Sequence, residues 1–515
     1  MKSAAYLEDF RCLKVITDCY YEGEEVALVD SPISLKIENA TFDGSMWHLY
    51  LSTDCDIEPF KDYYVKVNNQ LLHLDLGKIA RSASFDERYY YDGPLGVEYH
   101  ADFCVFRLWS PVCKEVKVVI NNQDYPLNYH GLGLWEGKVM GHLELAKYHY
   151  LARINEETFT ARDPYGISLD ATHQENDILD LAKTYQFKYG RPSFSGELKD
   201  AIIYEGHLKD LTYGLKGDDG CFNKMCNPLI VEHLKDLGIT HLQIMPVNSF
   251  EEIDEVDQDA KYNWGYNPAE YFSLSGWFAS ALSDAYGKIN EFKEMIDHFH
   301  KEGILITLDV VFNHVYKLTQ FSYGKLVPGY VGRTDAIDFL TDGSGCGNDL
   351  ATEHLMIRRL IKDVCHFFTT FYQIDGFRFD LMGLIDLETM NQLASLVKEL
   401  NSQAILYGEA WQMKTGLSQE RLASNTKELK GVGYFSDYFR NTVRGNPFNL
   451  APGIMMGTPI SQTLIDELWM KREATINFIE CHDNYTIKDQ MALTNPNWDL
   501  ATQKKYLKLG FALLI

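Results

Sequence analysis

The sequence lacks the features that mark membrane, secreted and metal-binding proteins. It has no apolar run of the roughly eighteen residues that a membrane-spanning helix needs, so we expect no membrane partner. Near the N-terminus, Glu8 and Asp9 interrupt the chain before an apolar run forms, so no secretory signal is apparent. The 10 cysteines are scattered singly, without paired CxxC motifs, which argues against zinc and predicts no bound metal. Without a secretory signal, we expect reduced thiols and a cytoplasmic location.

Positive charge is also scarce. Lys and Arg number 48 against 73 Asp and Glu, which gives a formal net charge of −25 at pH 7. Such a chain repels phosphate backbones, so we expect no nucleic-acid partner. The composition is otherwise that of a globular protein, with 46% hydrophobic and 23% charged residues. At roughly 150 residues per domain, the length predicts about three domains.

The patterns along the chain divide it into three predicted domains. Residues 1–95 contain short aromatic and aliphatic runs with a plausible hairpin turn at Asn68-Asn69, which indicates a small β domain of the sandwich type. Residues 96–190 contain several short strands, separated by turns such as Asn121-Asn122, at the spacing of a β-sandwich. In residues 195–515, strands alternate with helices, which indicates a parallel sheet with helical crossovers.

This alternation predicts a (β/α)8 barrel of the TIM type. The candidate strands are Ala201–Glu205, His241–Met245, Leu305–Val311, Gln373–Asp380, Ala404–Glu409, Val432–Phe435 and Thr475–Cys481. Only seven strands are found, because Leu500–Leu514 has the pattern of the helix that follows the seventh. We therefore expect a barrel lacking its eighth strand, with unpaired edges on the first and seventh strands.

One loop stands out by its composition. The segment Tyr262–Pro268 places three aromatic rings, two amide side chains and a glycine before a proline. Glycine and Asn-Pro favour a loop. Ring faces pack on the apolar faces of sugars and amides bind their hydroxyls, so a sugar site is one interpretation. The alternative is a well-packed aromatic loop without a ligand.

Four segments place charged and imidazole groups where predicted barrel strands end, which is where the active sites of such barrels lie. They are Asp309–His314, Gly376–Asp380, Leu406–Trp411 and Ile479–Asn484. Side chains alternate along a strand, so Arg378 and Asp380 are expected to face the lumen together. The guanidinium favours the ionised carboxylate that a nucleophile requires. Glu409, in a pocket with other carboxylates, is expected to have the raised pKa of a proton donor.

These segments resemble known enzymes. Tyr262–Pro268 resembles the hallmark of type I pullulanases, and the four strand-end segments resemble the conserved regions of glycoside hydrolase family 13. The resemblance implies hydrolysis of α-1,6-glucosidic branches by a retaining mechanism. It also implies that Asp380 is the nucleophile, Glu409 the general acid/base and Asp483 the stabiliser of the transition state.

The same resemblance implies which residues contact the substrate, an α-glucan. The predicted substrate-binding residues are Tyr266, His314, Arg378, His482, Trp264 and Trp411. Asp309 and Asn313 are expected to support them. Some family members bind calcium near the first of the four segments, but nothing here has clear ligand spacing, so no cofactor is predicted. Family members usually also carry a C-terminal β domain, for which no residues remain, so we expect a truncated chain.

Outside the barrel, three interpretations depend on packing. Phe106–Pro111 resembles part of the family 48 carbohydrate-binding module, but burial in the core is favoured over glucan contact for Trp109 and Trp135. For Arg88–Gly93, packing between domains is favoured over a sugar platform. The acid-rich run Glu251–Asp259 is predicted to be a solvated loop.

Through these resemblances, the sequence predicts a pullulanase-like enzyme that debranches pullulan, amylopectin or limit dextrins. Two alternatives stay open. One is another family 13 activity, such as isoamylase-type debranching or branching. The other is a non-catalytic fragment that binds α-glucan, which the missing eighth strand makes plausible.

Overall fold

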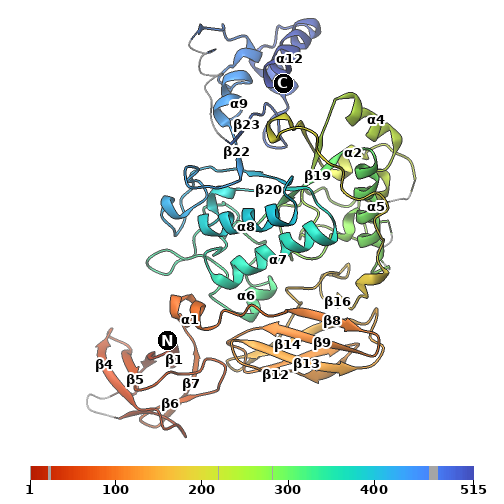
Figure 1. Cartoon of the computed structure of the whole chain (residues 1–515). Helices are drawn as coiled ribbons and strands as arrows, with labels where there is room; N and C mark the ends of the chain where they lie inside the picture. The colour runs from red at the N-terminus through yellow and green to blue at the C-terminus, as the bar shows by residue number, and fades with distance from the viewer. Residues whose placement is uncertain are drawn as a thin grey trace.

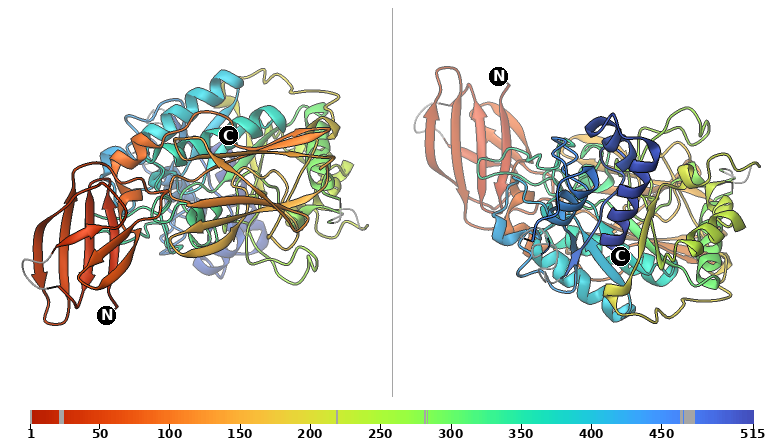
Figure 2. Two further views of the ribbon diagram at one scale, coloured as in Figure 1. Left: turned by 90° about the horizontal axis from the view of Figure 1, so that it is seen from below. Right: turned by 90° about the horizontal axis from the view of Figure 1, so that it is seen from above.

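The computed structural model describes residues 2–20, 25–217, 220–280, 282, 284–462, 465 and 474–515. Two sheet domains lie on one side of a parallel α/β unit, and α9 (Asp437–Val443) and α12 (Leu500–Leu514) lie on the opposite side (Figure 1). Views from below and above show that the N-terminal sheet projects to one side, whereas the second sheet domain lies across the α/β unit (Figure 2). The protein is therefore multidomain, with sheet domains preceding an α/β unit.

The N-terminal sheet has seven strands in the order β3-β6-β7-β1-β2-β5-β4. Alternate residues such as Leu49 and Leu51 are buried, because one face of the sheet packs on the core and the other meets solvent. The predicted hairpin is confirmed, since Asn68 turns the chain between β6 and β7 with φ of 52°. The strands are β1 (Ala4–Asp9), β2 (Cys12–Thr17), β3 (Val26–Leu28), β4 (Leu35–Phe42), β5 (Trp47–Thr53), β6 (Tyr64–Val67) and β7 (Gln70–Leu76).

The second sheet domain has two sheets, one in the order β11-β10-β14-β15 with β16 on β14, and one in the order β12-β13-β9-β8. Asn121 and Asn122 turn the chain from β10 to β11 with φ of 47° and 66°. Strand β13 begins only at Leu134, because the three preceding residues have positive φ. The strands are β8 (Gly96–His100), β9 (Phe103–Trp109), β10 (Glu115–Ile120), β11 (Gln123–Pro126), β12 (Asn128–Tyr129), β13 (Leu134–Met140), β14 (Lys147–Ile154), β15 (Glu157–Ala161) and β16 (Asn176–Asp177).

The two tryptophans of this domain are buried. Trp109 is 1% exposed and donates its indole N–H to the carbonyl of Tyr89 at 2.9 Å. Trp135 is 6% exposed and donates to the carbonyl of Ser110 at 2.9 Å. The prediction that both rings belong to the core is confirmed.

The α/β unit is built on one parallel sheet, with strands β17 to β23 in sequence order. Strands β18 to β21 are buried along their whole length, as in parallel sheets that helices cover. All seven predicted strands are present but shorter. For example, β20 begins at Gly376, because Gln373 has φ of 57° and turns the chain. The strands are β17 (Ile203–Gly206), β18 (His241–Ile244), β19 (Leu305–Val310), β20 (Gly376–Phe379), β21 (Ile405–Gly408), β22 (Gly433–Phe435) and β23 (Thr475–Ile476).

Helices begin where the sequence supplies caps. The side chain of Asn227 accepts a hydrogen bond from the amide of Leu229 at the start of α4. Asp386 does the same for the amide of Thr389 at the start of α8 (Leu387–Leu400). The remaining helices are α1 (Ala83–Arg88), α2 (Leu208–Leu211), α3 (Cys221–Lys224), α4 (Pro228–Asp236), α5 (Gly287–Lys301), α6 (Ser322–Leu326), α7 (Leu355–Phe371), α8 (Leu387–Leu400) and α11 (Ile487–Thr494).

The parallel sheet is open in the described part of the chain. There, β17 and β23 each pair on one side only, as the strand count predicts. A cavity of ≈ 1560 Å³ lies between them, lined by both strands and by Phe511, Leu514 and Ile515. None of the described helices is long and apolar enough to cross a membrane.

The segment Arg88–Gly93 packs between domains. Tyr89 is 3% exposed and lies 4.9 Å from the ring of Phe85. Arg359 of α7 donates hydrogen bonds to the carbonyls of Tyr91 and Gly93. Packing between domains is therefore confirmed over the alternative of a sugar platform.

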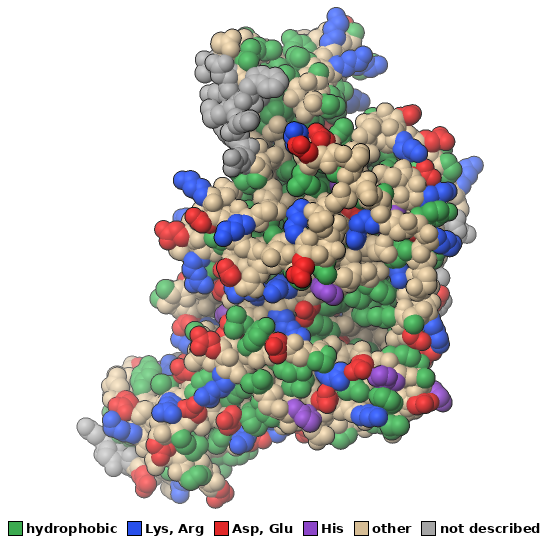
Figure 3. Space-filling view, in the orientation of Figure 1, with side chains coloured by type: hydrophobic (Ala, Val, Ile, Leu, Met, Phe, Trp, Pro, Cys, Tyr) green, Lys and Arg blue, Asp and Glu red, His purple; other side chains and the backbone are tan. Residues whose placement is uncertain are grey.

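The charged side chains are mostly at the surface, but the acidic run Glu251–Asp259 differs in part from its prediction. On the face in Figure 3, acidic and basic side chains of the described residues are interspersed. The prediction that Glu251–Asp259 is a solvated loop is wrong for two of its acidic side chains. Glu255 is 4% exposed and Glu251 is partly buried, because both pair with charged groups of the second sheet domain. Asp254 and Asp257 of the same run are exposed.

Candidate active site

The predicted site residues converge at the carboxyl ends of neighbouring strands. Asp309 lies on β19 and Arg378 on β20, where the two residues are register partners. Asp380 directly follows β20, and Glu409 directly follows β21. In a parallel sheet these ends meet at one edge, so residues distant in sequence form one cluster.

Arg378 is the centre of this cluster. Its side chain is 2% exposed and contacts three carboxylates. One terminal nitrogen, Nη1, lies 3.0 Å from Asp309 Oδ1 and 2.9 Å from Asp380 Oδ1, and Nη2 lies 2.7 Å from Glu409 Oε1. Burial opposes the charge of Arg378, but the surrounding acids outweigh it and raise its pKa further. The guanidinium therefore holds all three carboxyl groups in fixed positions, which suits a preorganised site.

The two predicted catalytic carboxyl groups have different surroundings. Asp380 Oδ2 accepts a hydrogen bond of 2.7 Å from the amide of Asn313, in addition to its contact with Arg378. Glu409 Oε2 accepts one of 3.0 Å from the backbone of Leu381. Burial raises the pKa of Glu409, and the charge of Asp380 adds to this effect against the opposing charge of Arg378. Glu409 is therefore suited to hold a proton, as a general acid must.

Asp309 lies behind this pair and is fully buried. Burial raises its pKa to about 7, with Arg378 opposing and Asp380 reinforcing the shift. Its other oxygen accepts a hydrogen bond of 2.8 Å from the hydroxyl of Tyr266. Asp309 thus joins the loop that carries Tyr266 to the arginine cluster.

Tyr266 stacks on His482, with ring centroids 4.9 Å apart and an interplanar angle of 21°. His482 Nδ1 lies 3.0 Å from Glu205 Oε1, and its backbone amide donates to Glu205 Oε2 at 2.7 Å. Burial opposes the charge on His482, but the bond and charge of Glu205 outweigh it and raise its pKa to about 9. The ring of Trp264 meets His482 edge-on at 5.4 Å. These contacts hold together the loop of Trp264 and Tyr266 and the loop of His482, which carry predicted substrate-binding residues.

His314 is held within the protein. Its Nε2 donates to the carbonyl of Tyr266 at 2.9 Å, and its Nδ1 lies 2.6 Å from Asn313 Oδ1. Burial lowers the pKa of this imidazole. In this structure His314 therefore orients Tyr266 and Asn313, and its predicted contact with a sugar stays a prediction.

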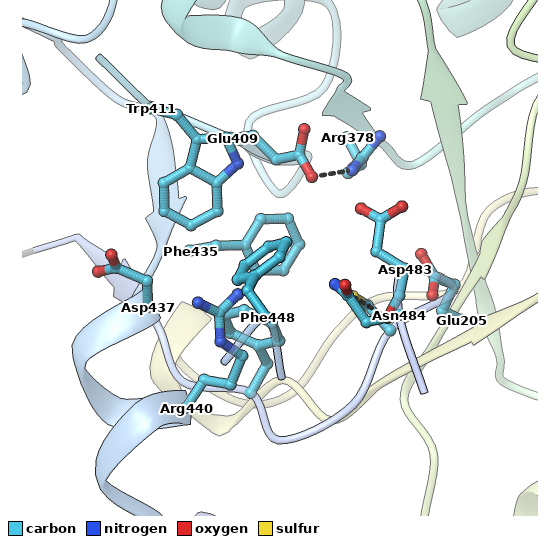
Figure 4. Close-up of a pocket in the computed structure, with 12 residues that line it drawn as sticks. Glu205, Arg378, Glu409, Trp411, Phe435, Asp437, Arg440, Phe448, Asp483 and Asn484 are labelled. Atoms are coloured by element: carbon cyan, nitrogen blue, oxygen red, sulfur yellow. Dashed lines mark hydrogen bonds and ion pairs between the residues drawn. The ribbon is translucent and has the colours of Figure 1, made fainter. Parts of the chain in front are cut away.

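A cavity of ≈ 210 Å³ opens beside the cluster (Figure 4). On one side, Trp411, Phe435 and Phe448 present ring faces, and on the other, the carboxyl group of Glu409 points at Arg378 with Asp483 nearby. An apolar wall facing polar groups is the arrangement that binds sugars. Asp483 lies at the edge of the cavity with its side chain about half exposed, and its Oδ1 is 3.5 Å from His482 Nε2.

Part of this site lies outside the predicted site residues. Glu205 and Phe435 end predicted strands, so the rule that marks the other strand ends applies to them too. Phe448 and Phe478 have no strand-end or motif signal, and only the fold brings them to the cavity. Among the described residues, no group of His, Cys, Asp and Glu could hold a metal ion.

Comparisons with known proteins show which family this chain resembles. Residues 229–324 match the family model described as "Alpha amylase, catalytic domain". The chain is 32% identical over 479 residues to the pullulanase of Bacillus subtilis (strain 168), which covers 86% of this chain and 66% of that protein. It is 27% identical over 506 residues to the chloroplastic pullulanase 1 of Arabidopsis thaliana, covering 83% and 49%. The chain thus spans less than two thirds of the length of these curated relatives.

Solved structures show the same relationship. The pullulanase from Anoxybacillus sp. LM18-11 in complex with maltotriose matches with a TM-score of 0.93 at 30% identity, covering 100% of this chain and 79% of that one. The type I pullulanase from Bacillus subtilis str. 168 in complex with maltose matches with a TM-score of 0.91 at 28% identity, covering 99% and 77%. With this identity and coverage, and with the arginine-centred carboxylate cluster in place, the chain belongs to the pullulanase family.

Proposed function

We propose that this protein hydrolyses α-1,6-glucosidic branches in pullulan, amylopectin or limit dextrins with retention of configuration. The observation that carries the proposal is the cluster in which Arg378 joins Asp380 to Glu409. The carboxylate of Asp380 accepts hydrogen bonds from a guanidinium and an amide, and burial raises the pKa of the other carboxyl group, which suits it to hold a proton. Two such groups are what retaining glycoside hydrolysis requires.

The proposed reaction has two steps. In the first, the Asp380 carboxylate attacks the anomeric carbon, the bond to the leaving oxygen breaks, and Glu409 gives that oxygen its proton. In the second, Glu409, now a carboxylate, takes a proton from water while the water oxygen attacks the same carbon and releases Asp380. Asp483 and Arg378 stabilise the charge that develops on the sugar and the carboxylates.

The substrate class is proposed from the cavity and from the relatives. Maltotriose and maltose are bound in the solved structures of the relatives from Anoxybacillus and Bacillus subtilis. In this chain, Tyr266, Trp264 and Trp411 offer ring faces near the carboxylate cluster, and His482 offers charged N–H groups. Stacking faces beside a cluster of carboxyl groups suit a neutral glucan rather than an anionic polymer, which the carboxylates would repel.

Products from pullulan distinguish this proposal from its rivals. We expect maltotriose as the main product, because cleavage of only the α-1,6 bonds of pullulan leaves that trisaccharide. An isoamylase-type or branching activity would leave pullulan intact and act on glycogen or amylopectin. Binding of maltodextrin without turnover of any glucan would instead support a non-catalytic glucan-binding protein.

Tyr266 offers a test of the loop's contribution. In Tyr266→Phe, the ring still stacks on His482 but the hydrogen bond to Asp309 is lost. We expect kcat/KM on pullulan to fall roughly tenfold, since a buried acceptor left without its donor costs about 1–3 kcal/mol. Tyr266→Ala, which also removes the stacking face, should lose more. Steady-state kinetics of both variants check this, and equal activity of Tyr266→Phe and wild type would contradict the role of the hydrogen bond.

We further propose that the second sheet domain is a carbohydrate-binding module of the family 48 type and that the protein is cytoplasmic. Two packed antiparallel sheets and the segment Phe106–Pro111 support the first proposal. Buried free thiols at Cys104, Cys113 and Cys365 support the second, because such thiols are usual in reducing compartments.

A further inference from the structure

The loop that carries Tyr266 is closed at its base by a short backbone ladder. The amide of Glu251 donates to the carbonyl of Asn267 at 2.9 Å, and the amide of Ala269 donates to Ser249 at 2.9 Å. The side chain of Asn267 adds a bond of 2.7 Å to Glu252. The direction in which Tyr266 points is therefore set by residues 249–252 and 267–269.

A buried arginine of the second sheet domain holds this base. Arg162 follows β15 and is 8% exposed. Its Nε donates to Glu270 Oε1 at 3.0 Å, and Nη2 donates to the carbonyls of Ala269 at 3.4 Å and Gln320 at 3.0 Å. Its Nη1 lies 3.4 Å from Glu251 Oε1. One side chain thus contacts both strands of the ladder from another domain.

His173 of the same sheet domain contacts the acidic side of the ladder. Its Nε2 lies 3.3 Å from Glu255 Oε1 and its Nδ1 lies 3.6 Å from Glu251 Oε2. Burial opposes the charge on His173, but Glu251 and Glu255 outweigh it and raise its pKa from 6.5 to about 9. The backbone carbonyl of His173 accepts a hydrogen bond of 3.2 Å from Arg162 Nη1. Arg162 and His173 are therefore in direct contact and act as one unit.

The charges around this unit are matched. Glu251, Glu255 and Glu270 face the two cations, and Lys288 of α5 lies near Glu255. Removing one of the two cations leaves buried carboxylates without a partner. This destabilises the structure around those carboxylates. The effect of a single substitution should therefore be concentrated in the ladder and the loop above it.

We propose that Arg162 and His173 are positioning residues, through which the second sheet domain holds Tyr266 in place at the active site. The sheet domain then serves catalysis by fixing the geometry of the barrel loop, and this role is separate from any binding of glucan to the sheet domain itself. The kinetic part of the test rests on the proposed function, whereas the structural part does not.

Hydrogen exchange tests the structural part on the whole chain. In Arg162→Met we expect the amides of Glu251 and Ala269, which form the ladder, to lose protection by about tenfold or more, because the ladder has lost its buried support. Tyr165→Phe is the matched control. It removes a 2.8 Å hydrogen bond from the sheet domain to Asp363 of α7, away from the ladder, and should leave these amides protected. Unchanged protection in Arg162→Met, or an equal loss in the control, would overturn the proposal.

Kinetics on a short aryl maltotrioside test the functional part, because this substrate is too small to engage the sheet domain and the cavity together. We expect Arg162→Met to lower kcat by about 10–100-fold, as misplacement of a site loop does. Arg162→Lys, which keeps the charge, should recover part of the loss. If only KM for long glucans rose, the domain would be acting as a binding module and the proposal would fail. If no variant or wild type hydrolysed any glucan, the proposed function would fail while the exchange result still decided the positioning role.

If Arg162→Met does not fold, a substitution of His173 provides a second test. His173 has φ of 54°, which Asn tolerates, so His173→Asn removes the cation with little backbone strain. The raised pKa means that the contact of His173 stabilises the fold fully below about pH 6.5 and is lost as pH rises through about 9. Protection of the Glu251 and Ala269 amides, corrected for intrinsic exchange, should therefore fall across this window in the wild type and not in His173→Asn. The same fall in both proteins would contradict the role of His173.

Discussion

Asp380→Asn is expected to lower the rate of pullulan hydrolysis by about 10⁴-fold or more, since the loss of a nucleophile removes the covalent route altogether. The amide cannot attack the anomeric carbon. Maltotriose affinity, measured by calorimetry, should change by less than about threefold, because the ring faces of Trp264 and Trp411 and the charge of His482 are untouched.

The contacts of Asp380 also predict how Asp380→Asn changes the stability of the fold. One oxygen of Asp380 accepts from Arg378 and the other from Asn313, so an amide replaces one of two acceptors by a donor. We expect a loss of roughly 1–3 kcal/mol in the free energy of unfolding, small beside the effect on rate. Asp236→Asn, on the exposed end of α4, makes the same change of charge away from the site and should retain wild-type activity. Equal losses of binding and rate in Asp380→Asn would make Asp380 a structural residue.

Glu409→Gln is expected to lower the rate on pullulan by about 10³-fold, which is the usual contribution of a general acid and base. The loss should depend on the leaving group. An aryl maltotrioside with an acidic phenol needs no proton to depart, so its first step should be nearly retained in the variant. A comparable loss on pullulan and on the aryl substrate would contradict the assignment of Glu409 as the acid.

The pH profile gives an independent check on the same residue. Burial and Asp380 raise the pKa of Glu409, and only its protonated form can donate. The kcat of the wild type should therefore fall as pH rises through that pKa, and this alkaline limb should be absent in Glu409→Gln. An alkaline limb that persisted unchanged in the variant would have to come from another group, such as His482, whose pKa is about 9.

Much of the catalytic cluster could be predicted from the sequence, because it rests on local rules. Asp309, Arg378 and Glu409 stand at or beside the ends of apolar strands, and parallel strands bring their carboxyl ends to one edge. All seven strands were found for the same reason, although Thr475–Cys481 was predicted and only Thr475–Ile476 pairs with β22. Strand existence follows from apolar runs, whereas strand ends depend on partners that a sequence does not show.

The parts that could not be predicted depend on contacts between distant segments. Glu251 and Glu255 look like members of a solvated acidic run, and only the approach of Arg162 and His173 from another domain buries them. The contacts of the His314 nitrogens with Tyr266 and Asn313 are likewise absent from the sequence pattern, because only the fold brings these residues together, and the predicted contact of His314 with a sugar stays a prediction. The rings of Phe448 and Phe478 at the cavity likewise have no local signature.

The most direct test of the central claim is to trap the sugar on the enzyme. In Glu409→Gln, an aryl maltotrioside should still glycosylate Asp380, while hydrolysis of that ester lacks its general base, so the intermediate should accumulate. Mass spectrometry of the intact protein and of its peptides should then show one maltotriosyl group, located on the peptide that contains Asp380 and absent after Asp380→Asn is added. An adduct on another residue, or none despite release of one equivalent of phenol, would contradict the account.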